Sequence, residues 1–321
     1  MRGRVALTAL LCFALEAVAQ VPERVCRIGL LGVASPATYQ RQVEAFRAGL
    51  RDLGYVEGRN VVIEARWADG DAARLPQLAT ELVATTPDVI VTSGPGTAAA
   101  KRATSTIPIV MAAAGDAVAT RLVESLSRPG GNVTGSSFLF PEINAKRLAI
   151  LKEAMPSLTR VGVLVNPQGT AVEASIAAMR QASSSLGLVL HIVEAKSMSD
   201  VGAAMDALVQ SGARAIVVAD HTVFVANAAH IAKAAAERNF PSIGFLELVE
   251  SGGTLAYGVD FPDLWRLAAT YVDRILKGTP PAMLPVQQPT RFELVVNVKS
   301  ARALGLAMPR TLIEPADRVL Q

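Results

Sequence analysis

The same succession of strands and helices occurs twice in this 321-residue chain. The first copy begins with the apolar stretch "RIGLLGVASP" (27–36) and continues through "NVVIEARWA", "DVIVTSG" and "IPIVMAA", with helical patterns between them. The second copy begins with "RVGVLVNP" (160–167) and continues through "LVLHIVEA", "RAIVVADHTVF" and "FPSIGF". Buried apolar strands that alternate with amphipathic helices are typical of a parallel sheet covered on both faces. The duplication therefore predicts an α/β protein with two similar Rossmann-like lobes.

The chain is expected to cross between these lobes more than once. After the second copy come "GGTLAYGVD", the helical pattern "DLWRLAATYVDRILKG", the proline-rich "TPPAMLPVQQP" and a last strand and helix in "RFELVVNVKSARALG". We expect a first lobe of residues 25–132 plus about 258–282 and a second lobe of 133–257 plus about 283–321, with the hinge near 132–137 and the later crossings. Short crossings place a ligand cleft between the lobes, and the carboxyl ends of the strands, where α/β proteins bind ligands, point into it.

The first twenty residues, "MRGRVALTALLCFALEAVAQ", differ from the rest of the chain. Arginines at positions 2 and 4 precede a short apolar stretch, and the small residues 17–19 follow it. This order predicts a secretory signal peptide (1–20) that is cleaved after about Ala19, and hence a periplasmic protein. A buried N-terminal helix is the alternative. Cys12 lies in this leader, so the mature chain contains one cysteine, Cys26, and no internal disulfide is expected.

The composition narrows the choice of partners. Charged residues make up 18% of the chain, the net charge is +3, and no run of basic residues occurs. We therefore expect no nucleic-acid partner. Beyond the leader, no apolar run reaches the roughly 20 residues that span a bilayer, so we expect no membrane insertion. A monomer is the default.

The loops that follow the strands carry the candidate binding residues. "TSGPGTA" (92–98) has the spacing of neither a phosphate-binding loop, nor a dinucleotide fingerprint, nor a nucleophile elbow. Its hydroxyls and backbone N–H groups at the start of a helix suit a small anion such as a carboxylate, and they would equally serve as a helix cap. Asp116 and Asp220, at other strand ends, could bind an ammonium group or act as caps or surface charges. The candidate ligand-binding residues are Ser35, Ser93, Gly94, Thr97, Asp116, Ser137, Asn166, Asp220, Glu247 and Tyr257, with Tyr39 and Phe138 as further stacking surface.

Catalytic, metal and cofactor sites are not indicated by the sequence. His191, His221 and His230 have no cysteine or second histidine at metal-ligand spacing. No activated nucleophile is signalled either, so we expect a non-catalytic protein without cofactor or metal. The alternatives are an exported α/β enzyme, a ligand-sensing protein for a membrane receptor, and the sensor domain of a transcription regulator. The last would need a DNA-binding helix-turn-helix before the first strand.

Four stretches carry a resemblance to a known family. The most distinctive are "LGYVEGRNV" (53–61) and "RPGGNVTG" (128–135), and "AKRLAILKEAMPSLTRVGVLVNP" and "FELVVNVKSARALGL" extend the similarity over nearly all of the chain after the leader. In these stretches the chain resembles the ABC transporter substrate-binding proteins, the family that includes the tryptophan- and phenylalanine-binding TrpX-like type.

This resemblance implies a type I periplasmic-binding-protein fold, with three crossings and hinge closure on the ligand. It implies that residues 93–97 hold a ligand carboxylate and that Asp220 or Glu247 holds an amino group. It further implies that the chain is the exported solute-binding component of an ABC-type importer. The candidate ligands are small molecules such as an amino acid or an aromatic compound. Delivery to a membrane permease driven by a separate ATPase follows from the same resemblance.

Overall fold

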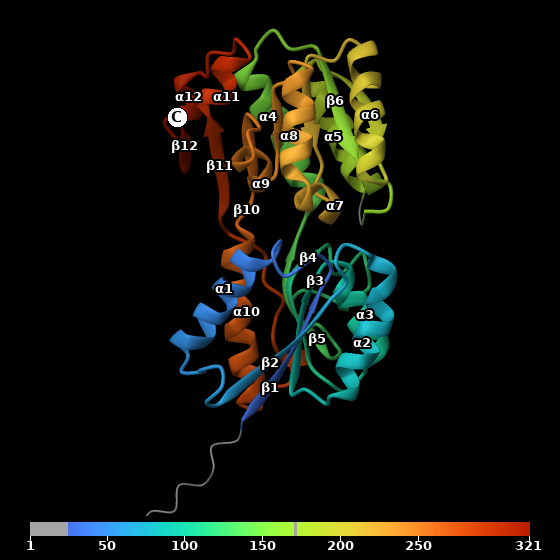
Figure 1. Cartoon of the computed structure of the whole chain (residues 1–321), viewed down its shortest axis with the longest axis vertical. Helices are drawn as coiled ribbons and strands as arrows, with labels where there is room; N and C mark the ends of the chain where they lie inside the picture. Colours follow the sequence, from blue (N-terminus) through green and yellow to red (C-terminus); the bar gives the residue numbers. More distant parts are fainter. Residues whose placement is uncertain (1–24, 170–171) are drawn as a thin grey trace, which may run out of the picture.

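The computed structural model describes residues 25–169 and 172–321, which form two α/β lobes stacked along the long axis of the molecule (Figure 1). The two similar lobes predicted from the duplication are confirmed. The predicted signal peptide, residues 1–20, lies outside the described residues. Within the described part of the chain, no helix has both the length and the apolar character needed to cross a membrane.

The first lobe is built on a parallel five-stranded sheet with the strand order β2-β1-β3-β4-β5. Helices α2 and α3 pack on one face, and α1 and α10 pack on the other. Val43, Phe46 and Leu50 form the buried stripe of α1, as their helical spacing predicts. The elements of this lobe are β1 (Cys26–Gly32), α1 (Gln40–Asp52), β2 (Val61–Trp67), η1 (Ala72–Arg74), α2 (Leu75–Ala84), β3 (Val89–Ser93), α3 (Pro95–Ala103), β4 (Ile109–Gly115), β5 (Val133–Phe138), α10 (Phe261–Leu276) and η2 (Pro281–Met283).

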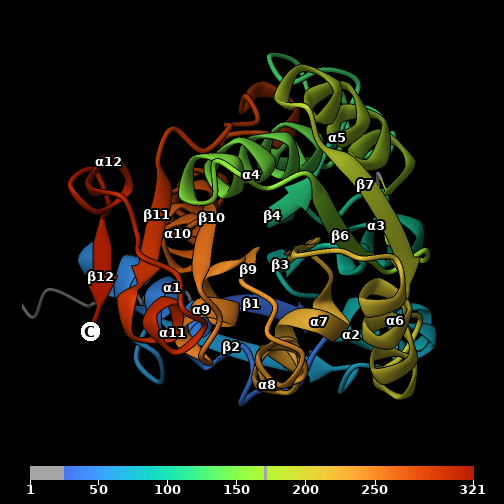
Figure 2. The same ribbon diagram turned by 90° about the horizontal axis from the view of Figure 1, so that it is seen from above.

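The second lobe is built on a seven-stranded sheet with the strand order β12-β11-β10-β9-β8-β6-β7. Only the β10–β11 pair among these described strands is antiparallel. Figure 2 shows α4 and α5 on one side of this sheet and α6 and α8 on the other. Its elements are α4 (Phe140–Ala154), β6 (Arg160–Val165), α5 (Val172–Leu186), β7 (Val189–Glu194), α6 (Met198–Gln210), β8 (Ala215–Val218), α7 (Thr222–Ala226), α8 (Ala228–Glu237), β9 (Ser242–Gly244), α9 (Leu246–Glu250), β10 (Leu255–Val259), β11 (Phe292–Asn297), α11 (Val298–Ala303), α12 (Arg310–Ile313) and β12 (Arg318–Leu320).

The first crossing lies later in the chain than the expected boundary at residue 133. Strand β5 pairs with β4, with Val133 opposite Ile109, so it belongs to the first sheet. The backbone N–H and C=O groups of β5 find their partners there, which is what a buried extended segment requires. The chain passes to the second lobe between Phe138 and Phe140, where α4 begins.

Two further crossings follow, and the last also differs from the expected boundary at about residue 283. The second crossing joins β10 to α10 through Asp260. Beyond η2, Leu284 and Val286 are still buried in the core of the first lobe. The backbone N–H of Gln287 donates to the carbonyl of Gly135 at 2.9 Å. This segment therefore runs beside β5, and the return to the second lobe takes place just before β11.

Candidate functional site

A cavity of about 160 Å³ lies where the two lobes face each other. Its wall draws on loops of the first lobe, on residues at the first two crossings and on loops of the second lobe. The lining residues are Ala34, Thr38, Tyr39, Gln42, Ser93, Gly94, Pro95, Ala113, Gly115, Phe138, Phe140, Gln168, Gly169, Asp220, His221, Thr222, Val225, Phe261 and Trp265. A dry cavity of roughly 150 Å³ is large enough to hold a benzene ring. The space suits a ligand of the size of one amino acid.

The first lobe supplies a neutral polar corner to this cavity. Ser93 ends β3, and Gly94 turns the chain with φ +51° before α3 begins at Pro95. The hydroxyl of Tyr39 lies 3.0 Å from the Oγ of Ser93. Burial raises the pKa of Tyr39, so its phenol keeps its proton. One hydroxyl of the pair donates to the other, which leaves one hydroxyl hydrogen beside the positive end of α3 for an acceptor on a ligand.

The crossings supply an aromatic wall. The ring centroids of Phe138 and Phe140 lie 4.6 Å apart, and Phe261 lies 5.7 Å from Phe138, both in edge-to-face arrangements. Trp265 meets Tyr39 edge to face at 5.5 Å. Because Phe138, Phe140 and Phe261 come from the first and second crossings, relative movement of the lobes changes the shape of this wall. Such a wall favours a ligand with a flat apolar group.

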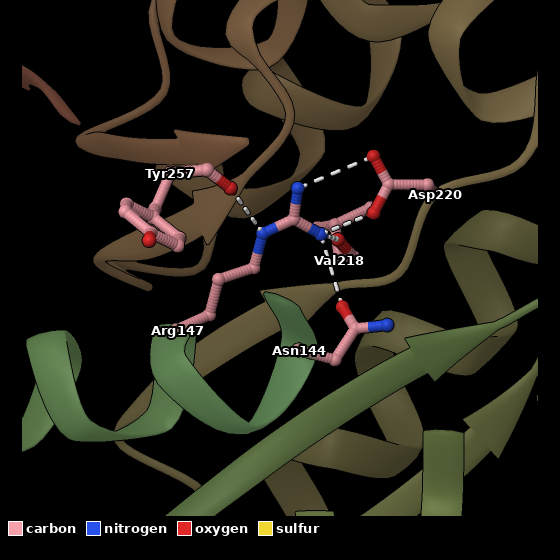
Figure 3. A network of polar contacts seen from close by, with 5 residues as sticks. All are labelled: Asn144, Arg147, Val218, Asp220 and Tyr257. Atoms are coloured by element: carbon pink, nitrogen blue, oxygen red, sulfur yellow. Dashed lines mark hydrogen bonds and ion pairs between the residues drawn. The ribbon is translucent and has the colours of Figure 1, made fainter. Parts of the chain in front are cut away.

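The second lobe places the carboxylate of Asp220 in the cavity wall, and Arg147 binds this carboxylate on the side away from the cavity. The guanidinium of Arg147, on α4, lies at 2.5 Å from Oδ2 of Asp220 and at 3.2 Å from Oδ1 (Figure 3). The Nε of Arg147 donates to the carbonyl of Tyr257 at 2.7 Å, and its Nη1 donates to Asn144 at 3.0 Å and to the Val218 carbonyl at 3.4 Å. The Arg147 side chain is 0% exposed and that of Asp220 is 10% exposed. The ion pair therefore faces the cavity through its acidic member.

His221 lies next to Asp220 in the same wall and is the N-terminal cap of α7. Its Nδ1 accepts the backbone N–H of Val223 at 3.3 Å. Burial lowers the pKa of His221 below its ordinary value. In the neutral ring that accepts through Nδ1, the proton is on Nε2. His221 therefore offers a donor rather than a charge.

Three of the ten candidate residues, Ser93, Gly94 and Asp220, line the cavity. Four others form hydrogen bonds within their own loop or to a neighbouring loop. The carboxylate of Asp116 accepts the N–H of Ala119 at 2.9 Å. The Oγ of Ser137, on β5, accepts the N–H of Ala117, in the loop after β4. Asn166 accepts from Gln168 in its own loop and donates to the carbonyl of Lys196 in the loop after β7. Ser35 lies 3.1 Å from the hydroxyl of Thr38.

The remaining three candidates are placed differently. Thr97 is fully buried behind the turn, and its hydroxyl has no hydrogen-bond partner. The carboxyl of Glu247 has one buried oxygen without a partner, and burial raises its pKa. Tyr257 stacks on Phe292 at 5.8 Å and lines a separate cavity beside the crossings. The binding roles of all ten residues stay predictions.

The sequence analysis missed Arg147, Gln42, Phe140, Phe261 and Trp265. Arg147 did leave a signal, because it occupies the apolar stripe of α4 with Ile143, Leu151 and Ala154. An arginine at such a position requires a buried acceptor. Among the described residues, no group of three or more His, Cys, Asp or Glu side chains is arranged to hold a metal ion.

Two α/β lobes joined by three crossings around a small cavity define a solute-binding protein of the type I periplasmic class. The chain belongs to the family of ABC transporter substrate binding proteins, whose family model matches residues 28–320.

Individual relatives agree with this assignment. A "Tyrosine-binding protein" of Clostridioides difficile (strain R20291) is 28% identical over 281 residues, which is 87% of this chain and 81% of the relative. The crystal structure of a conserved domain protein from Vibrio cholerae has a TM-score of 0.86 at 28% identity and covers 92% of this chain and 100% of its own. An ABC domain in complex with L-Trp from Streptococcus pneumonia has a TM-score of 0.85 at 24% identity with the same coverage, and supports the fold.

Proposed function

We propose that this chain is the exported, non-catalytic binding component of an importer, and that it takes up a zwitterionic amino acid with an aromatic side chain. The amino acid binds in the cavity between the lobes. A membrane permease driven by a separate ATPase receives it. The observation that carries this proposal is one small cavity that combines a neutral polar corner at Ser93, a carboxylate at Asp220 and an aromatic wall at the crossings.

The carboxylate end of the ligand is assigned to the first lobe. The hydroxyls of Ser93 and Tyr39 and the N-terminus of α3 offer donors and a partial positive charge. None of the described residues that line the cavity is lysine or arginine. A carboxylate is therefore bound by neutral donors, and a ligand with a second, side-chain carboxylate has no counter-charge.

The amino end is assigned to Asp220. Arg147 occupies one side of this carboxylate, and the other side borders the cavity. An oxygen atom of a carboxylate has more than one lone pair, so Asp220 keeps acceptor capacity for an ammonium group. The ring of the ligand packs against Phe138, Phe140 and Phe261. The tyrosine-binding relative and the structure with bound L-Trp favour the same ligand class.

Calorimetric titration of a chain without residues 1–20, unfolded and refolded to remove any bound ligand, tests this proposal. We expect L-Trp or L-Tyr to bind more tightly than L-Leu, and L-Glu and L-Lys to bind weakly. Two analogues of L-Trp, titrated into the unmodified protein, test the two ends of the ligand. Tryptamine lacks the carboxylate, and indole-3-propionate lacks the ammonium group. Each loss of a charged hydrogen bond is expected to cost about 1.5–3 kcal/mol, or roughly 10- to 150-fold in affinity.

A matched pair of variants locates the carboxylate. Ser93→Ala is expected to weaken binding of L-Trp and to leave binding of tryptamine unchanged. Ser105→Ala, at an exposed position of the same lobe, serves as the control. A folded protein that binds none of the aromatic amino acids, or that binds tryptamine as well as L-Trp, would contradict the assignment. Export is tested separately, by recovering the processed chain from the periplasmic fraction.

A further inference from the structure

The guanidinium of Arg147 contacts both the cavity wall, at Asp220, and strand β10, at Tyr257. Its Nη groups bind both oxygens of Asp220, in the cavity wall just after β8. Its Nε binds the backbone carbonyl of Tyr257, in β10. Figure 3 shows the side chain reaching from α4 between these two groups. One rigid group thus joins the wall of the cavity to the strand that leads into the second crossing.

Tyr257 lies close to the second crossing between the lobes. Strand β10 ends at Val259, and Phe261 begins α10 in the first lobe. Phe261 itself lines the cavity. A shift of the Tyr257 carbonyl therefore affects the direction in which the chain leaves the second lobe.

Arginine suits this double contact for a geometric reason. Its planar fork presents five N–H donors in fixed directions, and here they reach Asp220, Tyr257, Asn144 and Val218 together. The guanidinium is fully buried, so no water replaces a contact that it gives up. A displacement of the Asp220 carboxylate would therefore move the guanidinium relative to the Tyr257 carbonyl.

Gly258 leaves the room that this arrangement needs. A Cβ atom added there would lie 3.2 Å from Nη2 of Arg147. That distance is tighter than ordinary van der Waals contact, so the guanidinium would have to shift by a few tenths of an ångström. The backbone of Gly258 is outside the positive-φ region that strains other residues.

We propose that Arg147 is a positioning residue that couples contact with a ligand at Asp220 to the geometry of the second crossing, and thereby to closure of the lobes. The identity of the ligand rests on the proposed function, whereas the coupling itself does not. Arg147 is not among the described residues that line the cavity. It acts through Asp220 on one side and through Tyr257 on the other.

The test uses two variants and one matched control. Gly258→Ala displaces the guanidinium without removing Arg147, Asp220 or Tyr257. Gly202→Ala makes the same chemical change in α6 of the same lobe, where an added Cβ meets nothing within 4 Å. Arg147→Lys keeps the positive charge beside Asp220, and its single ammonium cannot serve both Asp220 and Tyr257. Thermal melting of each variant reports whether it is folded.

Two readouts are measured on each protein. The first is the distance between spin labels at residue 80 on α2 and residue 184 on α5, recorded without ligand and with L-Trp, in a background with Cys26→Ser. The second is the affinity for L-Trp. We expect Gly258→Ala and Arg147→Lys to shift or broaden the ligand-free distance distribution and to lower affinity between about twofold and thirtyfold. Gly202→Ala is expected to match the wild type in both readouts.

The outcomes test the coupling through Arg147 and the proposed ligand separately. Ligand-free distances in Gly258→Ala and Arg147→Lys that coincide with those of the wild type would overturn the coupling, whatever the affinities are. A wild-type protein that binds no aromatic amino acid would overturn the proposed ligand, and the ligand-free distances would still test the coupling. If Gly202→Ala changes the distances as much as Gly258→Ala does, the effect is one of general stability and the coupling is rejected.

Discussion

Arg41 on α1 of the first lobe donates to Glu250 on α9 of the second lobe, with 2.8 Å between Nη1 and Oε2. Glu250 also accepts from Arg318 of its own lobe at 2.8 Å. Glu250 is therefore held in place within the second lobe and binds across to the first. This ion pair bridges the two lobes, so it stabilises the arrangement of the lobes seen here.

Removing the bridge between the lobes is expected to weaken ligand binding slightly. Arg41→Ala eliminates a contact between the lobes, so the arrangement seen here is expected to lose stability relative to one in which the lobes lie further apart. Exposed ion pairs contribute about 0.2–1 kcal/mol, so we expect a loss of roughly 1.5- to 5-fold in affinity at low salt and a smaller loss at high salt. Calorimetric titration at two ionic strengths measures it.

Arg318→Ala provides the control for that experiment. It removes the other cation on Glu250, and that contact lies within the second lobe. We expect its effect on affinity to be smaller than that of Arg41→Ala. Equal effects of the two variants would show that the interlobe contact has no special role in closure.

The buried ion pair is expected to be important for stability. Arg147→Met leaves the Asp220 carboxylate nearly buried without its cation, which is expected to lower the free energy of unfolding by about 3–5 kcal/mol. The double variant Arg147→Met/Asp220→Leu removes both charges and is expected to recover a large part of that loss. Urea unfolding followed by circular dichroism gives both values. A double variant less stable than the single one would contradict this account.

Stability is expected to fall in mild acid because of His221. Burial holds the pKa of its folded form below the ordinary value of 6.5. The unfolded chain therefore takes up protons first, and the stability contributed by neutral His221 is present above pH 6.5 and is lost as the pH falls through the lowered pKa. Protonation also removes the lone pair on Nδ1 that accepts from Val223. The difference in unfolding midpoint between pH 7.5 and pH 5.5 measures this effect.

His221→Asn isolates that contribution. Asparagine is a good first residue for a helix and does not titrate in this range, so α7 keeps a cap. Glu247 acts in the opposite sense, because burial raises its pKa and favours its protonated form in the folded protein. We expect His221→Asn to be less sensitive to pH between 7.5 and 5.5 than the wild type. An unchanged pH profile would exclude His221 as the cause.

The aromatic wall is expected to determine selectivity among amino acids. Phe261→Leu removes a ring that lies at the cavity and near Phe138. Since an aromatic contact contributes about 0.5–1.5 kcal/mol beyond its area, we expect affinity for L-Trp to fall roughly 2- to 12-fold and affinity for L-Leu to change less. Phe240→Leu makes the same change in the core of the second lobe, away from the cavity, and should leave the ratio of affinities unchanged. If Phe261→Leu left the ratio of the affinities for L-Trp and L-Leu unchanged, the ring of Phe261 would not contribute to the binding site.

The sequence patterns of this chain are informative about single elements and their ends, and less so about how the elements pair. Local patterns predicted the strands and helices of both copies. Apolar residues that recur every 3.6 residues indicate the buried face of a helix, and a short continuous apolar run indicates a buried strand, so each pattern depends on one element alone. They also placed Ser93, Gly94 and Asp220 at strand ends that meet at the cavity. They misplaced the first crossing, since the pairing of β5 with β4 depends on a partner that the strand's own sequence does not specify.

The sequence alone therefore determined the α/β class, the duplication, the family and the strand ends that face the cleft. Tertiary structure decided which side chains meet there. Arg147 and Asp220 are 73 positions apart, and Phe138 and Phe261 are brought together only by two separate crossings. Contacts of this kind depend on how the lobes pack and on the paths of the connecting segments. A local pattern reports which face of an element is buried, and it carries no information about what that face will touch.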